Sequence, residues 1–155
     1  PLTMSDLRLA SGAHPALQEV STRNLYEDGQ IDGAPAPEAI RKVFDDGGIR
    51  ASAQFRYQVS DASGKSELRA RVDWFVDEAR AEPAFRGRHM PEALAVTETL
   101  PIGNDAFAYR DEYLGFRVGT VVVEIRAKPA WPGLREFSRV YAGHLGEALA
   151  RQAPR

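Results

Sequence analysis

The sequence predicts an α+β fold: an antiparallel, strongly twisted sheet of about five strands, with a C-terminal amphipathic helix and two shorter helices packed on one face. Two neighbouring segments, residues 49–59 and 67–76, alternate apolar and polar side chains, as a strand with one buried face does. A loop of turn-forming residues at 60–66 joins them as a hairpin. The last segment, residues 134–149, instead carries an apolar stripe with helical period.

A chain of 155 residues suits a single domain, residues 1–155, with its own core. The content of 43% hydrophobic and 27% charged residues is ordinary for a globular protein. No apolar window reaches the length of a membrane span, so we expect no transmembrane segment in this chain. The net charge of −2 lacks the basic excess that nucleic-acid binding requires. We therefore expect a protein or small-molecule partner and no nucleic acid.

The residues that usually carry chemistry form no recognisable catalytic or metal-binding pattern. Cysteine is absent, which removes disulfides and thiolate ligands. His14, His89 and His144 fit no metal-ligand spacing, and we interpret them as structural or solvent-facing. The glycines form no phosphate-binding motif, and no serine lies in a nucleophile elbow. The sequence favours a non-catalytic protein without metal or cofactor.

The first third of the chain gives the weakest structural signal. A helix is expected from Pro15 towards Asn24, followed by a turn-rich loop at residues 28–35. Residues 37–46 predict a short helix with one apolar side, because proline is tolerated in a first helical turn and two glycines follow its end.

The alternation also predicts the register of the first hairpin, because its apolar side chains must share one face. The expected cross-strand pairs are Val59–Ser66, Tyr57–Leu68, Phe55–Ala70 and Ala53–Val72. On the other face, the same register places Arg56 opposite Arg69 and Gln54 opposite Arg71.

This cluster of Arg56, Arg69 and Arg71 is the first candidate binding site. Like charges directly opposite each other across two strands are unfavourable, so the cluster calls for an anion. A bound ligand or a partner would supply one. The alternative is that Glu67, Asp73 or the acidic first third of the chain supplies the carboxylate, since charge pairs at protein surfaces are common.

Residues 77–87 predict a helix despite Pro83, which delays or kinks it, and parts of residues 94–100 are expected to be extended. A second hairpin is predicted from residues 106–113 and 116–126, with its turn at Leu114-Gly115 and a bulge or close backbone approach at Gly119. The final helix should lie across the apolar face of the sheet, together with the helices at 37–46 and 77–87.

The second candidate site consists of the aromatic residues around the second hairpin. Tyr109, Tyr113, Phe116 and Trp131 lie close together in the sequence, and they are candidates to line an apolar pocket or a partner-binding patch. The alternative is that they pack in the core. We take Tyr109, Tyr113 and Trp131 as candidate ligand-binding residues.

Three stretches form a recognisable pattern: residues 103–109 (GNDAFAY), residues 117–123 (RVGTVVV) and the passage from the first hairpin into residues 77–85. Through them, residues 47–150 show a resemblance to small bacterial envelope lipoproteins of unassigned function. It implies a PsbP-like α+β fold, an exported or membrane-tethered origin and a binding or accessory role. It transfers no active site. Since the chain has no cysteine, a lipid tether would lie upstream of Pro1.

Three functions follow as hypotheses. The leading one is a non-catalytic, extracytoplasmic binding or accessory module of the cell envelope. The second is a small enzyme or ligand-handling protein whose arginines hold an anionic substrate while a nearby tyrosine or histidine exchanges protons. The third is an intracellular subunit of a homo-oligomer, suggested by the apolar Phe75 and Val122 on the polar faces of their strands.

Overall fold

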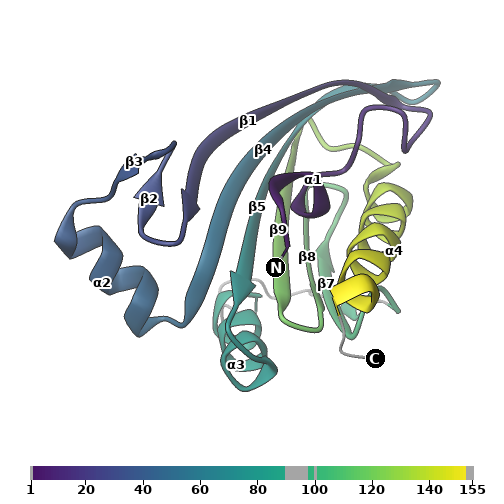
Figure 1. Cartoon of the computed structure of the whole chain (residues 1–155). Coiled ribbons are helices and arrows are strands. Elements are labelled where there is room, and N and C mark those ends of the chain that lie inside the picture. Colours follow the sequence, from purple (N-terminus) through teal and green to yellow (C-terminus); the bar gives the residue numbers. More distant parts are fainter. Residues whose placement is uncertain (1, 90–97, 100, 153–155) are drawn as a thin grey trace.

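The computed structural model describes residues 2–89, 98–99 and 101–152, which form an antiparallel sheet of nine strands and four helices (Figure 1). The strands lie side by side in the order β3-β2-β1-β4-β5-β9-β8-β7-β6. The elements are α1 (Met4–Leu7), β1 (Leu17–Glu27), β2 (Gln30–Ile31), β3 (Ala34–Pro35), α2 (Glu38–Asp46), β4 (Ile49–Asp61), β5 (Gly64–Phe75), α3 (Glu78–His89), β6 (Glu98–Thr99), β7 (Asp105–Tyr109), β8 (Tyr113–Val118), β9 (Val121–Lys128) and α4 (Leu134–Gln152).

The α+β class, the antiparallel sheet and the C-terminal helix are confirmed, but the number of about five strands is wrong. Strands β2, β3 and β6 have two residues each, which is too short to show a period in the sequence. The helix expected from Pro15 is in fact strand β1, which pairs with β4 so that Val20 lies opposite Tyr57 and Thr22 opposite Phe55. Pairing with a long neighbouring strand outweighs a weak local helical signal.

The hairpin of β4 and β5 forms the centre of the sheet, and its predicted register is confirmed. Tyr57 pairs with Leu68 and Phe55 with Ala70. The strands extend further into the expected loop than predicted, so that Ser60 pairs with Lys65 and only a short turn remains.

One face of the sheet carries the main core and is covered by α4, as predicted, and by the N-terminal segment with α1 (Figure 1). Phe137 and Tyr141 of α4 contact the ring of Tyr57 edge-on, at centroid distances of 5.3 and 6.0 Å. The Tyr57 hydroxyl donates to the Tyr141 hydroxyl over 3.2 Å, and the Tyr141 hydroxyl donates to the Leu7 carbonyl over 2.6 Å. The backbone N–H of Leu9 donates to the Tyr57 hydroxyl over 3.0 Å. These bonds join sheet, helix and N-terminal segment.

The opposite face carries a smaller apolar cluster beneath α3, so the prediction that all helices cover one face is wrong. Phe75 and Val122 are buried there against Ala81 and Phe85, and the Phe85 ring stacks on Phe107 at a centroid distance of 5.4 Å. An irregularity in the pairing of β4 just after its first residue, Ile49, brings that residue to this face as well. The residues that suggested an oligomer interface are therefore covered by the chain's own helix.

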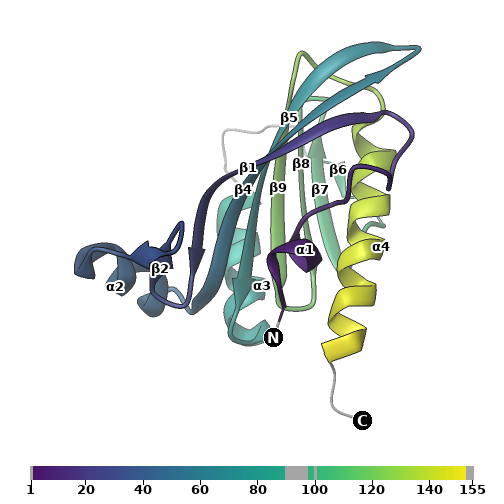
Figure 2. The ribbon, with the colours of Figure 1, turned by 45° about the horizontal axis from the view of Figure 1, so that its top comes forward.

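Helix α2 also departs from the prediction, because none of its residues is buried. It projects with β2 and β3 beyond the end of the long strands (Figure 2). Its Phe44 stacks on Tyr26 of β1 at a centroid distance of 4.0 Å, whereas Val43 is 70% exposed.

The predicted second hairpin is a meander of three strands. Leu114-Gly115 is not a turn but lies inside β8, paired with β7 on one side and β9 on the other. The chain turns instead at residues 110–112, where Arg110 has a φ of 51°, and at Gly119, where φ is 56°. Of the segment expected to be extended, residues 98–99 form β6, and residues 94–97 and 100 lie outside the described residues.

Candidate functional site

Six side chains form a row across the sheet face that points away from α4. The strand registers place them in the order Ser21, Arg56, Arg69, Arg126, Tyr113 and Tyr109. The adjacent row contains Arg23, Gln54, Arg71 and Glu124. Because every second residue of a strand shares a face, both rows belong to one surface. We call its five arginines, Arg23, Arg56, Arg69, Arg71 and Arg126, the arginine face.

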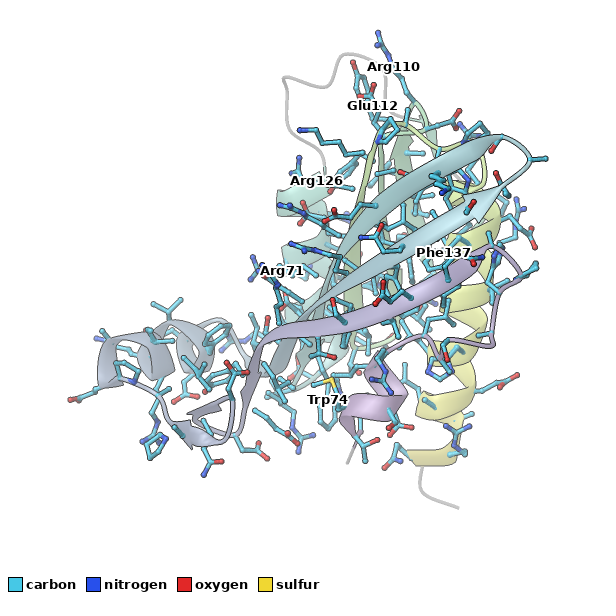
Figure 3. All side chains as sticks on the ribbon, turned by 90° about the horizontal axis from the view of Figure 1, so that it is seen from above. Arg71, Trp74, Arg110, Glu112, Arg126 and Phe137 are labelled. Atoms are coloured by element: carbon cyan, nitrogen blue, oxygen red, sulfur yellow. The ribbon has the colours of Figure 1, made fainter. Side chains whose placement is uncertain are left out.

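The arginine face surrounds a hollow of about 370 Å³. Its lining includes all five arginines together with Gln54 and Glu124. Helix α3 covers the sheet on the same side, but only at the end where Phe75 and Val122 lie. Figure 3 shows Arg71 and Arg126 extending from the sheet on the side away from Phe137 of α4. One end of this sheet face is therefore closed by a helix, and the other presents arginines.

Three carboxylates lie among the arginines. Glu67 is shared, since its Oε1 is 2.9 Å from Nε of Arg56 and 3.0 Å from Nε of Arg69. Asp73, fully buried, is 3.1 Å from Arg71, and Glu124 is 3.0 Å from Arg126. The alternative explanation is therefore borne out for the three arginines of the predicted cluster, because Glu67 and Asp73 pair with all of them. Over the whole arginine face, three carboxylates pair with five arginines.

The contacts of Glu67 show how the cluster is arranged. The hydrogen bond from Arg69 lowers the pKa of Glu67, the charge of Arg56 lowers it further, and partial desolvation opposes both. Arg56 itself gains less from the contact: its Nε is buried and, despite the short distance, makes no hydrogen bond among the described residues. Arg56 is therefore held to Glu67 by charge rather than by a well-aligned hydrogen bond.

The structure brings together most of the residues that the sequence suggested as site residues. Arg56 and Arg69 share their row with Tyr113 and Tyr109, and Arg71 lies in the next row. The guanidinium carbon of Arg126 lies 5.2 Å from the centre of the Tyr113 ring, a cation–π distance. The arginine and tyrosine candidates are thus parts of one surface.

Trp131 does not belong to this surface. It is 1% exposed and lies in the main core, and its indole Nε1 donates to Asp61 over 3.1 Å. Phe116 is also a core residue. Both residues therefore pack in the core, as the alternative interpretation states.

The histidines whose position is described lie away from the arginine face. His14 packs against Trp131 and Phe137 in the core, and its Nδ1 accepts from the Ala16 N–H over 3.1 Å. His144 is on α4, on the other side of the sheet. The side chain of His89 lies outside the described residues. The convergence of imidazole and guanidinium groups that would have favoured the enzyme hypothesis is not seen in the part of the chain that the structure describes.

Two residues of the arginine face could not be identified as site residues from sequence. Arg23 lies in a segment whose local pattern suggested a helix. Arg126 was visible as a polar residue in the alternating segment that forms β9, but only the pairing of β9 with β5 places it opposite Arg69. That pairing joins strands far apart in the chain, and a single sequence carries no local signal for it.

The chemistry available on this surface is the binding of anions. A guanidinium is positively charged at any physiological pH and donates up to five hydrogen bonds, in a fork that matches carboxylates and phosphates. Among residues 2–89, 98–99 and 101–152, no group of three or more potential metal ligands is found. Within the same residues, no helix has the length and apolar character needed to cross a membrane.

Comparisons with protein-family models, with curated proteins and with solved structures gave no match to this chain.

Proposed function

We propose that this protein is a non-catalytic binding module that holds an anionic ligand on the arginine face. The observation that carries the proposal is the hollow of about 370 Å³, which five guanidinium groups line. Its size lies near the lower end of the roughly 300–1,000 Å³ typical of small-molecule sites.

Bringing the arginines together costs free energy in the unliganded protein. Arg56 lies directly opposite Arg69, and Arg69 directly opposite Arg126. Each such pair of like charges is unfavourable by a few tenths to about 1 kcal/mol. Glu67 and Glu124 offset part of this repulsion, and the positive charge that remains is our reason for assigning the cluster to ligand binding.

A titration with inorganic phosphate, followed by NMR of the backbone amides, tests the proposal. The amides of β4, β5 and β9 should shift on addition of phosphate at constant ionic strength. The variants Arg69→Gln and Arg126→Gln should each weaken binding at least about tenfold, since a charge-assisted hydrogen bond contributes roughly 1.5–3 kcal/mol.

The matched control is Arg139→Gln. Arg139 is an exposed, ion-paired arginine on α4, on the far side of the sheet, so the same change of charge there should leave binding unchanged. Equal losses in all three variants would show that only the net charge of the protein matters. Saturating shifts elsewhere, with none in the three strands, would refute the proposal.

We also propose that the module works outside the cytoplasm, in association with the cell envelope. The support for this is the resemblance of residues 47–150 to envelope lipoproteins. Fractionation of cells that express the complete gene tests it: recovery of the protein only in the cytosol would contradict the location without affecting the anion site.

A further inference from the structure

We propose that the ligand of the arginine face presents a compact dianion, either a terminal phosphate group or two adjacent carboxylates, which Arg56, Arg69 and Arg126 hold together. This inference rests on the proposed function and specifies the chemical class of its ligand.

The balance of charges on this surface favours a ligand with two negative charges. Five guanidinium groups line the hollow, and three carboxylates, Glu67, Asp73 and Glu124, pair with them. The difference is two positive charges. The neighbouring row adds Glu19 at one end and Lys128 at the other, which cancel. A ligand group with two negative charges neutralises the surface, whereas a monoanion leaves one repulsive charge.

The geometry is the second argument. Arg56, Arg69 and Arg126 are direct cross-strand neighbours on three adjacent strands, and neighbouring strands are about 4.8 Å apart. Three long side chains starting from such close positions are long enough to meet above the middle strand, once Arg126 leaves its contacts with Tyr113 and Glu124. A group with several acceptor oxygens can accept hydrogen bonds from more than one guanidinium there. A single carboxylate has fewer oxygens and accepts from fewer guanidinium groups.

The state of the internal carboxylates is the third argument. Glu67 divides one carboxylate oxygen between two arginines, and Nε of Arg56 remains without a hydrogen bond. Glu124 is 21% exposed and itself lines the hollow. One carboxylate therefore serves both Arg56 and Arg69, and Glu124 competes with a ligand at Arg126.

Isothermal titration calorimetry at pH 8 and constant ionic strength provides the test, with pairs of probes that differ in charge. Phenyl phosphate is compared with methyl phenyl phosphate, and succinate with monomethyl succinate. We expect each dianion to bind at least about tenfold more tightly than its monoanionic partner, a difference of about 1.4 kcal/mol. The tighter of the two dianions shows whether the natural group is a phosphate or a dicarboxylate.

Two substitutions of opposite effect complete the test. Arg126→Gln should remove the preference for the dianion. Glu124→Gln removes a competing carboxylate, and it should tighten dianion binding several-fold, a result that a misfolded variant cannot give. Arg139→Gln serves again as the control and should behave as wild type.

The outcomes separate this inference from the proposed function. Equal affinity for monoanions and dianions, lost together in Arg126→Gln, would overturn the dianion and leave the anion-binding module standing. Weaker dianion binding in Glu124→Gln would overturn the competition argument and with it the charge count. The absence of binding for all four probes would overturn both proposals.

Discussion

At the scale of single residues, the hydroxyls of Tyr57 and Tyr141 form a hydrogen-bonded pair in the core. Both rings are fully buried, and their hydrogen bonds reach the backbone at Leu7 and Leu9. Burial raises the pKa of Tyr57 to about 12, although its hydrogen bonds with Tyr141 and Leu9 act in the opposite direction. Burial also raises the pKa of Tyr141 well above its ordinary value.

These pKa values predict a loss of stability in alkali. Well below pH 10 both tyrosines are neutral in the folded and unfolded states, so this pair contributes its full stability. Between pH 10 and about 12 the unfolded chain ionises first, and the free energy of unfolding should fall, for Tyr57 by roughly 2 kcal/mol at pH 11.5. Urea unfolding followed by far-UV circular dichroism at pH 8 and at pH 11.5 measures the fall.

The variant Tyr57→Phe is the control for this prediction. At pH 8 it should be less stable by about 1–3 kcal/mol, because the Leu9 N–H loses its buried acceptor. Its further loss on going to pH 11.5 should be smaller than in wild type, since only Tyr141 of the pair remains to ionise. An equal alkaline loss in both proteins would mean that other groups control it.

At the scale of elements, helices α2 and α3 have similar predictions from sequence and opposite roles in the structure. Phe85 of α3 is fully buried against the sheet and stacks on Phe107, whereas Val43 of α2 is 70% exposed. Whether the apolar side of a helix packs against the sheet depends on where the neighbouring strands place the helix. The sequence of the helix itself does not contain this information.

This contrast predicts unequal costs for two truncations. Phe85→Ala should lower the free energy of unfolding by about 3–5 kcal/mol, because it leaves a cavity between helix and sheet. Val43→Ala should change it by less than about 0.5 kcal/mol, as is usual for exposed sites. Chemical denaturation of the two variants measures both values. Similar costs would contradict the packing described for α2 and α3.

The elements that the sequence predicts correctly are those with a long, regular pattern. In β4 and β5 a dozen alternating residues allow a single register, so the opposition of Arg56 and Arg69 is predictable. In α4 the apolar stripe predicts both the helix and the face that docks. Where the pattern is short or mixed, the prediction fails. Strand β1 is stabilised by its pairing with β4, which its own sequence does not show. Leu114-Gly115 lies inside β8, and the turns lie before and after that strand.

The candidate site divides in the same way. Arg56, Arg69 and Arg71 follow from one local hairpin, whereas Arg126 joins them only through the pairing of β5 with β9. Trp131 is close in sequence to Tyr113 but enters the core on the other side of the sheet. Proximity along the chain is therefore a poor guide to this surface, and strand order is a good one.

At the scale of the whole molecule, the two faces of the sheet have different tasks. One face is covered by α4 and the N-terminal segment (Figure 1) and forms the main hydrophobic core. The other is closed by α3 at one end and presents the arginine face at the other. A ligand on that face should stabilise the fold, because it binds the native state and relieves the repulsion among the arginines.

The expected result is a rise in melting temperature with the preferred dianion. At a concentration of about one hundred times the dissociation constant, binding adds about 2.7 kcal/mol, or roughly 5–10 °C for a domain of this size. Differential scanning calorimetry at constant ionic strength measures it. Arg126→Gln should lose most of the rise and Arg139→Gln should keep it. An equal rise in both would indicate only the general stabilising effect of such salts.

The rows of direct cross-strand partners have a consequence for how the sequence can vary. Inserting or deleting one residue in the middle of β4, β5 or β9 would turn every following side chain to the other side of the sheet, and would drive guanidinium groups into the core. Changes in length should be tolerated at the turn between β4 and β5 and at residues 110–112, but within the three strands this surface can change only by substitution.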